Sequence, residues 1–217
     1  MKIHHPAPWR ALTLGILLGG LGMQPALSAS SDGATALPEL DATEAQGLTY
    51  MREEEKLARD VYRYFYPMWE AGLFENISES EQSHFEAIGE LLATYRLDDP
   101  AAQDLPGVFV NPDLQALYDL LIATGSGSEL AALQVGALIE ETDMVDIVEA
   151  LAATDQPDIT VVYENLLRGS RNHLRAFVAA IEALGVPYTA QVLPQEEVDA
   201  IVDSPMERGG SKVGGRP

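Results

Sequence analysis

Residues 77–85 read Ile-Ser-Glu-Ser-Glu-Gln-Ser-His-Phe and place Glu81 three positions before His84. On an α-helix this spacing puts both side chains on one face. The apolar residues Ile77 and Ile88 share that face, so a carboxylate and an imidazole are predicted inside an apolar stripe. Buried polar groups need partners, and a metal ion is one partner that satisfies both.

Four long helices are predicted from apolar positions that recur at steps of three and four. They span, in order, about residues 43–66, 78–95, 128–154 and 158–184. Pro67 is expected to end the first helix, and a loop is expected through Asn76 before the second. The connection 96–127 carries a short helix that Asn111 caps and Pro112 begins.

A further short helix is expected near residues 195–202, and no segment of any length shows strand alternation. The pattern therefore predicts one all-α domain. Its fold would be a four-helix bundle in which a long crossover, carrying a short extra helix, joins helices two and three.

Each of the four long helices carries an ionisable residue within its apolar stripe. These residues are Glu55, Glu81 with His84, Glu140, and His173. Three buried carboxylates near one another would be very unfavourable without a counter-charge. Cations bound by oxygen and imidazole ligands remove that conflict. Glu140 and His173 are also equidistant from the predicted turn at 155–158, which puts them at the same height in a helix hairpin.

Each of these residues also has a purely structural interpretation. Ser78 and Glu81 fit a capping box, in which Glu81 serves only the start of a helix. The run Glu53-Glu54-Glu55 fits a solvated charged face, although the stripe selects Glu55 as the inward residue. His173 fits a core histidine with a hydrogen-bond partner, and Tyr62 fits either plain core or a hydrogen-bond donor beside the site.

The first residues of the 217-residue, 23.5 kDa chain differ from the rest. Lys2 and Arg10 precede an apolar run at 11–23, and small residues follow, which is typical of a secretory signal peptide. We expect a signal peptide at 1–28, with cleavage after Ser30 and an uncleaved anchor as alternatives. The expected order is then a flexible lead-in at 29–42, the helical domain with its short C-terminal helix at 43–203, and a disordered tail at 204–217.

The composition limits the location and the partners. The chain has no cysteine, so it has neither disulfides nor a lipid-bearing cysteine. After signal removal, 11 basic residues face 34 acidic ones, a formal charge of −23. This charge disfavours nucleic acid and anionic membrane as partners, and it suits either cation attraction or plain solubility. The mature protein is expected to be periplasmic or extracellular, with no membrane contact.

Several motifs together resemble a known family. Glu-Lys-Leu-Ala-Arg-Asp-Val-Tyr at 55–62 is similar to the first helix of rubrerythrins, which belong to the ferritin-like superfamily. With Asn76-Ile77, Ser80-Glu81 and Gly-Ser-Arg-Asn-His-Leu-Arg-Ala-Phe at 169–177, the chain most resembles the ferritin-like family called domain of unknown function 2202. The resemblance covers about residues 45–195.

The resemblance implies a non-haem metal site, with iron as the usual metal and manganese or zinc as alternatives. Such a site holds one or two ions, and by analogy of fold two Fe(II) ions in a pair would be oxidised together by O₂ or peroxide. Ser170 stands where the superfamily has a further glutamate, so one carboxylate is missing. Asp143 is the first candidate to replace it, followed by Glu141 and Glu164.

The absence of cysteine also leaves no rubredoxin-like cluster, so an enzyme of this kind would need an external electron donor. Metal sequestration without catalysis, or a structural bundle with a vestigial site, are the alternatives. The oligomeric state stays open.

Overall fold

The computed structural model describes residues 39–208. The expected signal peptide, the lead-in as far as residue 38 and the end of the tail from residue 209 lie outside the described residues. Within 39–208 the chain is all-helical, with six α-helices and no strand. None of the helices in this part of the chain has both the length and the apolar character needed to cross a membrane.

The first helix, α1, spans Ala42–Trp69 and begins with a capping box. The Asp41 carboxylate accepts hydrogen bonds from the N–H groups of Thr43 and Glu44, and Glu44 accepts one from the Asp41 N–H. The expectation that the helix ends before Pro67 is wrong, because α1 continues through this residue. Pro67 lies in the last turn, where the helix loses little more than the hydrogen bond of one N–H group.

Helix α2 spans Gly72–Thr94 and begins earlier than predicted. Only Glu70 and Ala71 separate it from α1, and Glu70 turns the chain in the left-handed conformation with φ 52°. The added turns pack into the core through the buried side chains of Phe74 and Ile77. The turn-forming residues Gly72 and Asn76 are the reason why the sequence predicted a loop there. Ser78 consequently lies inside α2, so the capping-box interpretation of Glu81 is wrong.

The remaining helices lie within two residues of their predicted bounds. They are α3 (Pro112–Gly125), α4 (Glu129–Ala153), α5 (Pro157–Ala183) and α6 (Gln195–Val202). Asn111 caps α3, as the sequence predicts, and Ser128, the predicted first residue of its helix, caps α4. The signals are strong here because side-chain caps and proline coincide with the ends of the apolar pattern.

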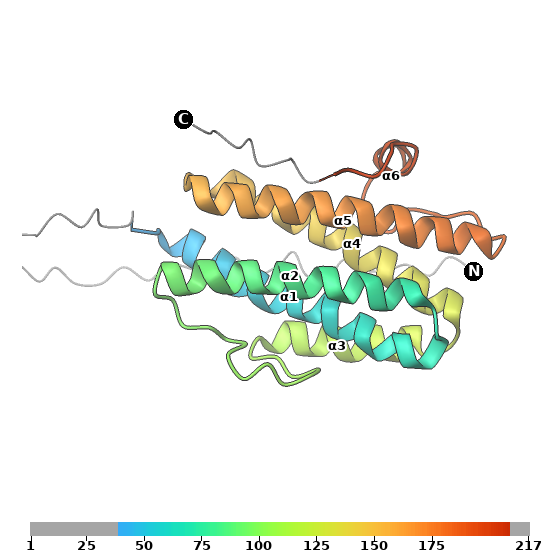
Figure 1. The fold of residues 1–217 in the computed structure, drawn as a ribbon, viewed down its shortest axis with the longest axis horizontal. Helices are drawn as coiled ribbons and strands as arrows, with labels where there is room; N and C mark the ends of the chain where they lie inside the picture. The colour runs from blue at the N-terminus through green and yellow to red at the C-terminus, as the bar shows by residue number, and fades with distance from the viewer. Residues whose placement is uncertain (1–38, 209–217) are drawn as a thin grey trace, which may run out of the picture. The chain divides into compact units, whose positions relative to one another are not determined.

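The four long helices contact one another in a closed ring. Helix α1 packs against α2 and α4, and α5 packs against the same two helices. Helix α3 covers α1 and α4, while α6 lies on α5 (Figure 1). Figure 1 also shows α3 carrying the chain back along the length of the helices, so that α2 and α4 run in the same direction.

Two apolar clusters fill the interior of this ring. One contains the packed rings of Tyr62, Phe65, Phe74 and Phe177, and the other contains Met51, Ile88, Ile147 and Tyr163. On α1, α2 and α5 the predicted ionisable residues lie between the members of the two clusters, and on α4 Glu140 lies next to Ile139 of the first cluster and before Ile147 of the second. The polar groups therefore form a layer across the middle of an otherwise apolar core.

Charged residues on the outer side of α1 fasten the crossover. Arg52 binds the Asp99 carboxylate, and the Lys56 ammonium donates to the carbonyl of Leu105 at 2.7 Å. Glu53 accepts from the N–H groups of Val110 and Asn111. These contacts explain why so many charged residues of α1 are buried.

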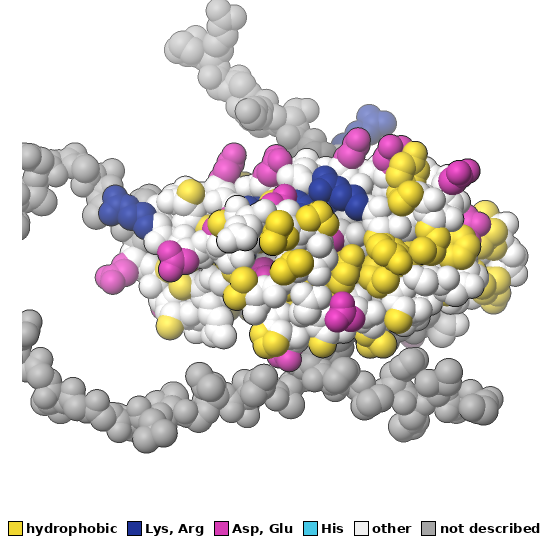
Figure 2. Space-filling model, turned by 90° about the horizontal axis from the view of Figure 1, so that it is seen from below, with side chains coloured by type: hydrophobic (Ala, Val, Ile, Leu, Met, Phe, Trp, Pro, Cys, Tyr) yellow, Lys and Arg dark blue, Asp and Glu magenta, His cyan; other side chains and the backbone are white. Residues whose placement is uncertain are grey.

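The face of the molecule that α3 and the crossover form carries exposed hydrophobic side chains. Figure 2 shows this face, where yellow side chains lie among scattered acidic groups and no histidine is visible. The crossover and α3 contribute Leu105, Val108, Val110 and Leu120 to the exposed hydrophobic residues of the described chain.

Candidate metal centre

The structure brings all five predicted ligand residues together in the polar layer. Glu55 comes from α1, Glu81 and His84 from α2, Glu140 from α4 and His173 from α5. The three glutamates are at most 2% exposed, and the side chains of His84 and His173 are 12% and 9% exposed. Each long helix thus contributes at least one ionisable side chain to the same buried layer.

Glu81 occupies the centre of the group, with one carboxylate oxygen directed to each histidine. Its Oε2 lies 2.7 Å from His84 Nδ1, and its Oε1 lies 2.8 Å from His173 Nδ1. Glu55 Oε2 lies 3.3 Å from His84 Nδ1, and Glu140 Oε2 lies 3.4 Å from His173 Nδ1. The arrangement is two sets of three residues that share Glu81, and within each set the ligand atoms lie within 4.8 Å of one another.

Hydrogen bonding within the described residues does not account for these atoms. Glu55 Oε1 and the Nδ1 atoms of both histidines are buried and have no hydrogen-bond partner with acceptable geometry there. Buried polar atoms are seldom left in this condition, because each costs about 1–3 kcal/mol. Oxygen and imidazole atoms that converge in this way without well-directed hydrogen bonds fit the donor set of a metal ion.

The charges of the cluster also fit a site for a cation. Burial raises the pKa values of Glu55 and Glu140 to about 7. Against the effect of burial, Glu81 and Glu140 raise the pKa of His173 to about 10, and Glu81 and Glu55 raise that of His84 well above its usual range. Against burial as well, the two imidazolium charges lower the pKa of Glu81. The layer therefore retains positive charge, as protons or as a metal ion, to offset its carboxylates.

Two neighbouring hydroxyl groups orient the ligands. Ser80 Oγ lies 2.9 Å from His173 Nε2, so this nitrogen is engaged while Nδ1 faces Glu81 and Glu140. The Tyr62 hydroxyl donates to Glu140 Oε1 at 2.5 Å, which selects the hydrogen-bonding interpretation of Tyr62 over that of plain core. Outer hydrogen bonds of this kind hold metal ligands in orientation. The role of Ser80 has no sequence signal, because its partner lies on another helix.

Ser170 and Asp143 lie beside the two ligand sets. The Ser170 hydroxyl donates to Asp143 Oδ2 and to the carbonyl of Leu166. Asp143 therefore reaches the place where the missing carboxylate was expected, but it belongs to neither set of three ligand atoms. Its Oδ1 is buried without a hydrogen-bond partner in the described chain.

The other proposed substitutes lie elsewhere. Glu141 is fully buried, and its carboxylate accepts from the Tyr188 hydroxyl and from the N–H groups of residues 191–193. Its role is to hold the extended segment before α6. Glu164 is exposed on α5. Neither residue is available to the centre.

The three consecutive glutamates of α1 point in three directions. Glu53 binds the start of α3, Glu54 contacts Asp146 of α4, and Glu55 joins the centre. All three are buried, so the interpretation of this run as a solvated face is wrong. Tertiary contacts on three sides of α1 explain why all three glutamates are buried. The apolar period of the sequence identifies only Glu55 as an inward-facing residue.

Gly169 makes room for His84. A Cβ atom at this position would lie 2.4 Å from His84 Cε1 and 2.6 Å from its Nε2. The imidazole therefore lies against the bare backbone of α5, and this position accepts no larger residue without moving a ligand. This role of Gly169 has no sequence signal, because His84 lies on another helix.

Comparison with known families gives one match over most of the chain. Residues 44–205 match the family described as "Uncharacterized protein domain (DUF2202)". The matched segment includes all six helices except the first residues of α1.

One relative is known both as a sequence and as a structure. The "Uncharacterized protein MJ0754" of Methanocaldococcus jannaschii is 47% identical over 177 residues, which are 81% of this chain and 96% of the relative. The "Crystal structure of hypothetical protein MJ0754 from Methanococcus jannaschii DSM 2661" is similar with a TM-score of 0.76 and 46% identity. That match covers 80% of this chain and all of the other.

Proposed function

This chain belongs to the family of uncharacterised DUF2202 domains, and we propose that it is an exported metal-binding protein with the four-helix bundle of ferritin-like proteins. The observation that carries the proposal is the position of Glu81. Each of its oxygens faces one imidazole Nδ1, and these two nitrogens together with Glu55 Oε1 lack hydrogen bonds of acceptable geometry within the described residues. A carboxylate so placed suits a bridge between two metal ions.

Three carboxylates and two imidazoles suit iron best, with manganese and zinc as alternatives. Glu55 and His84 would hold one ion, Glu140 and His173 the other, and Glu81 would contact both. A bound iron pair would supply electrons to O₂ or peroxide, which makes Fe(II) oxidation or peroxide reduction the proposed reaction class. Reducing equivalents for a repeated reaction would come from an external donor, since the chain has no cysteine.

The protein's own residues prepare the site for this chemistry. Tyr62 fixes Glu140, and Ser80 engages the far nitrogen of His173. The two apolar clusters on either side of the layer restrict water. The ligands are thereby held in place before a metal ion arrives, which favours binding.

A second function, metal sequestration without catalysis, is supported by Ser170. This residue replaces a carboxylate with a hydroxyl, and it engages Asp143 in a hydrogen bond. The ligand set is then one carboxylate short of a full pair site. A protein that holds one ion firmly would store or deliver metal rather than couple two ions in a redox reaction.

Metal content tests the proposal directly. We expect stoichiometric iron, manganese or zinc in protein prepared with each metal, and loss of that metal in Glu81→Ala and His173→Ala. Glu79→Ala, which changes an exposed glutamate on the same helix, should retain it. Unchanged content in both ligand variants would refute the assignment. Two iron ions per chain with rapid Fe(II) oxidation would favour catalysis, and one ion without turnover would favour sequestration.

A further inference from the structure

A second group of carboxylates lies beside the proposed centre, outside the five ligand residues. It consists of Glu54 on α1 with Asp143 and Asp146 on α4. Glu54 is 6% exposed and Asp143 is 7% exposed, whereas Asp146 is only half-buried. Such a burial of like charges calls for an explanation, because each buried carboxylate costs free energy when it is ionised.

The three residues form a sequence of contacts that leads toward the centre. The carboxyl groups of Glu54 and Asp146 are near enough to interact, and Glu54 also lies near enough to Asp143 and Glu55 for their charges to act on it. Asp143 in turn feels the charges of Glu55 and Glu140. Positions 140, 143 and 146 also follow one another at steps of three along α4, so their side chains share one side of that helix.

Two oxygen atoms in this group have no hydrogen-bond partner within the described residues. They are Glu54 Oε2 and Asp143 Oδ1, and both are buried. These atoms belong to residues that neighbour the centre, where Glu55 Oε1 and the Nδ1 atoms of both histidines also lack hydrogen-bond partners. Unpartnered carboxylate oxygens in a buried group are the donors that hard divalent cations accept.

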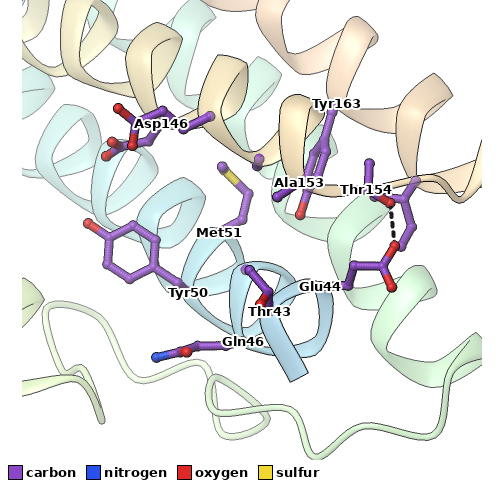
Figure 3. A pocket seen from close by; sticks show the side chains of 13 residues that line it. Thr43, Glu44, Gln46, Tyr50, Met51, Asp146, Ala153, Thr154 and Tyr163 are labelled. Carbon is purple, nitrogen blue, oxygen red and sulfur yellow. Dashed lines mark hydrogen bonds between the residues drawn. The ribbon is translucent and has the colours of Figure 1, made fainter. Parts of the chain in front are cut away.

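The outer end of the group opens into a pocket. The pocket has a volume of about 340 Å³ and lies between the first turns of α1 and α5 and the last turns of α4. Figure 3 shows Asp146 and Tyr50 on the same side of the pocket, with Met51 between them and Tyr163. Asp146 therefore reaches both the pocket and the buried Glu54.

The charge of the pocket favours cations. Its lining includes Glu44, Asp146 and Glu149, and no basic residue is among the described side chains that line it. A concave surface with charges of one sign concentrates ions of the opposite sign and raises their association rates. The chain as a whole carries a formal charge of −21, which acts in the same direction.

We propose that Asp146, Glu54 and Asp143 form an outer cation site that takes divalent metal ions from this pocket and passes them to Glu55 and Glu140. This inference rests on the proposed function, because it needs a metal-binding centre as its destination. The three residues would control the rate at which metal ions enter. The five inner residues would determine the final occupancy of the centre. The competing entrance is the face at His84, whose imidazole is 12% exposed on α2.

Cobalt(II) uptake by the metal-free full chain separates rate from occupancy. Visible absorption of the bound ion, recorded by stopped flow, gives the loading rate, and its final amplitude gives the occupancy. We expect Asp146→Asn and Glu54→Gln to load at least about 10-fold more slowly than the wild type at low ionic strength. The final amplitude of Asp146→Asn should equal that of the wild type.

Glu149→Gln is the matched control, because this exposed residue lines the same pocket and loses the same charge. We expect its loading rate to fall by much less than that of Asp146→Asn, because this exposed charge acts through the general attraction of the pocket for cations. Wild-type rates in both Asp146→Asn and Glu54→Gln would overturn the outer site and leave the centre intact. An equal slowing in Glu149→Gln would also overturn it, because general charge would then explain the effect.

The two proposals fail in different ways. If the wild type binds no cobalt, iron, manganese or zinc, the proposed function fails, and the outer site fails with it. If the wild type binds metal and a His84→Ala variant alone changes the loading rate, the entrance lies at the α2 face and only the outer site is refuted. Thermal unfolding of each variant shows that the comparison is made between folded proteins.

Discussion

Glu81 differs from the other glutamates of the centre in its charge. The imidazolium groups of His84 and His173 flank it, and they lower its pKa although burial acts against this, while the pKa values of Glu55 and Glu140 rise to about 7. One carboxylate is thus kept ionised at the middle of the layer. With pKa values near 7, Glu55 and Glu140 can take up protons near neutral pH, and a bound metal ion would displace those protons.

Gly169 supports this geometry by its lack of a side chain. In Gly169→Ala, the new Cβ would overlap the His84 imidazole, so the ring must leave its position beside Glu55 and Glu81. We expect a loss of metal affinity of about 10-fold or more, measured by competition with a chromogenic chelator.

The control for this change is Gly47→Ala. A Cβ atom at Gly47 meets its nearest neighbour, the Tyr163 hydroxyl, at an ordinary 3.8 Å. This variant adds a methyl group to a helix without touching the centre, so its metal affinity should equal that of the wild type. Equal affinity in both glycine variants would mean that His84 is not a ligand.

At the scale of the elements, α4 carries two consecutive buried glutamates that have different roles. Glu140 faces the centre, and Glu141 faces outward, where its carboxylate receives three backbone N–H groups and a tyrosine hydroxyl. The segment before α6 has no regular structure of its own. Glu141 therefore accepts hydrogen bonds that the backbone N–H groups of this segment would otherwise donate to water.

Glu141→Gln tests this anchoring role. The neutral amide keeps one acceptor oxygen and loses the charge, so we expect the free energy of unfolding to fall by about 2 kcal/mol. Amide hydrogen exchange at residues 191–193 should accelerate, because their N–H groups lose a charged acceptor. Metal content should stay at the wild-type level, and a loss of bound metal without unfolding would instead make Glu141 part of the centre.

At the scale of the whole molecule, the polar layer lowers the stability of the fold, and a bound metal ion would raise it. The ring of four helices encloses buried carboxylates that only cations can neutralise, so any ion that binds the native state raises stability. A free metal concentration 100 times the dissociation constant contributes about 2.7 kcal/mol. For a domain of this size, the melting temperature should then rise by about 5–10 °C.

Differential scanning calorimetry with and without metal measures this increase. Glu81→Ala supplies the comparison, because it removes the residue shared by both ligand sets. Its melting temperature should not respond to metal. A response equal to that of the wild type would place the stabilising ion outside the centre.

The sequence by itself predicted the all-helical class and the four long helices with their inward-facing ionisable residues. Caps and prolines mark most helix ends locally, and the apolar period identifies the inward side of each helix. The same reasoning misplaced the turn near Pro67 and Gly72, because buried Phe74 and Ile77 overrode the local turn preference.

Only the tertiary structure decided how the polar groups are divided among their tasks. Glu53, Glu54 and Glu55 have the same chemistry and adjacent positions, yet they serve the crossover, Asp146 and the centre. The hydrogen bonds of Ser80 to His173 and of Ser170 to Asp143 likewise join different helices. A sequence period reports which side of one helix faces inward, whereas the partner that meets a side chain there depends on how the helices pack.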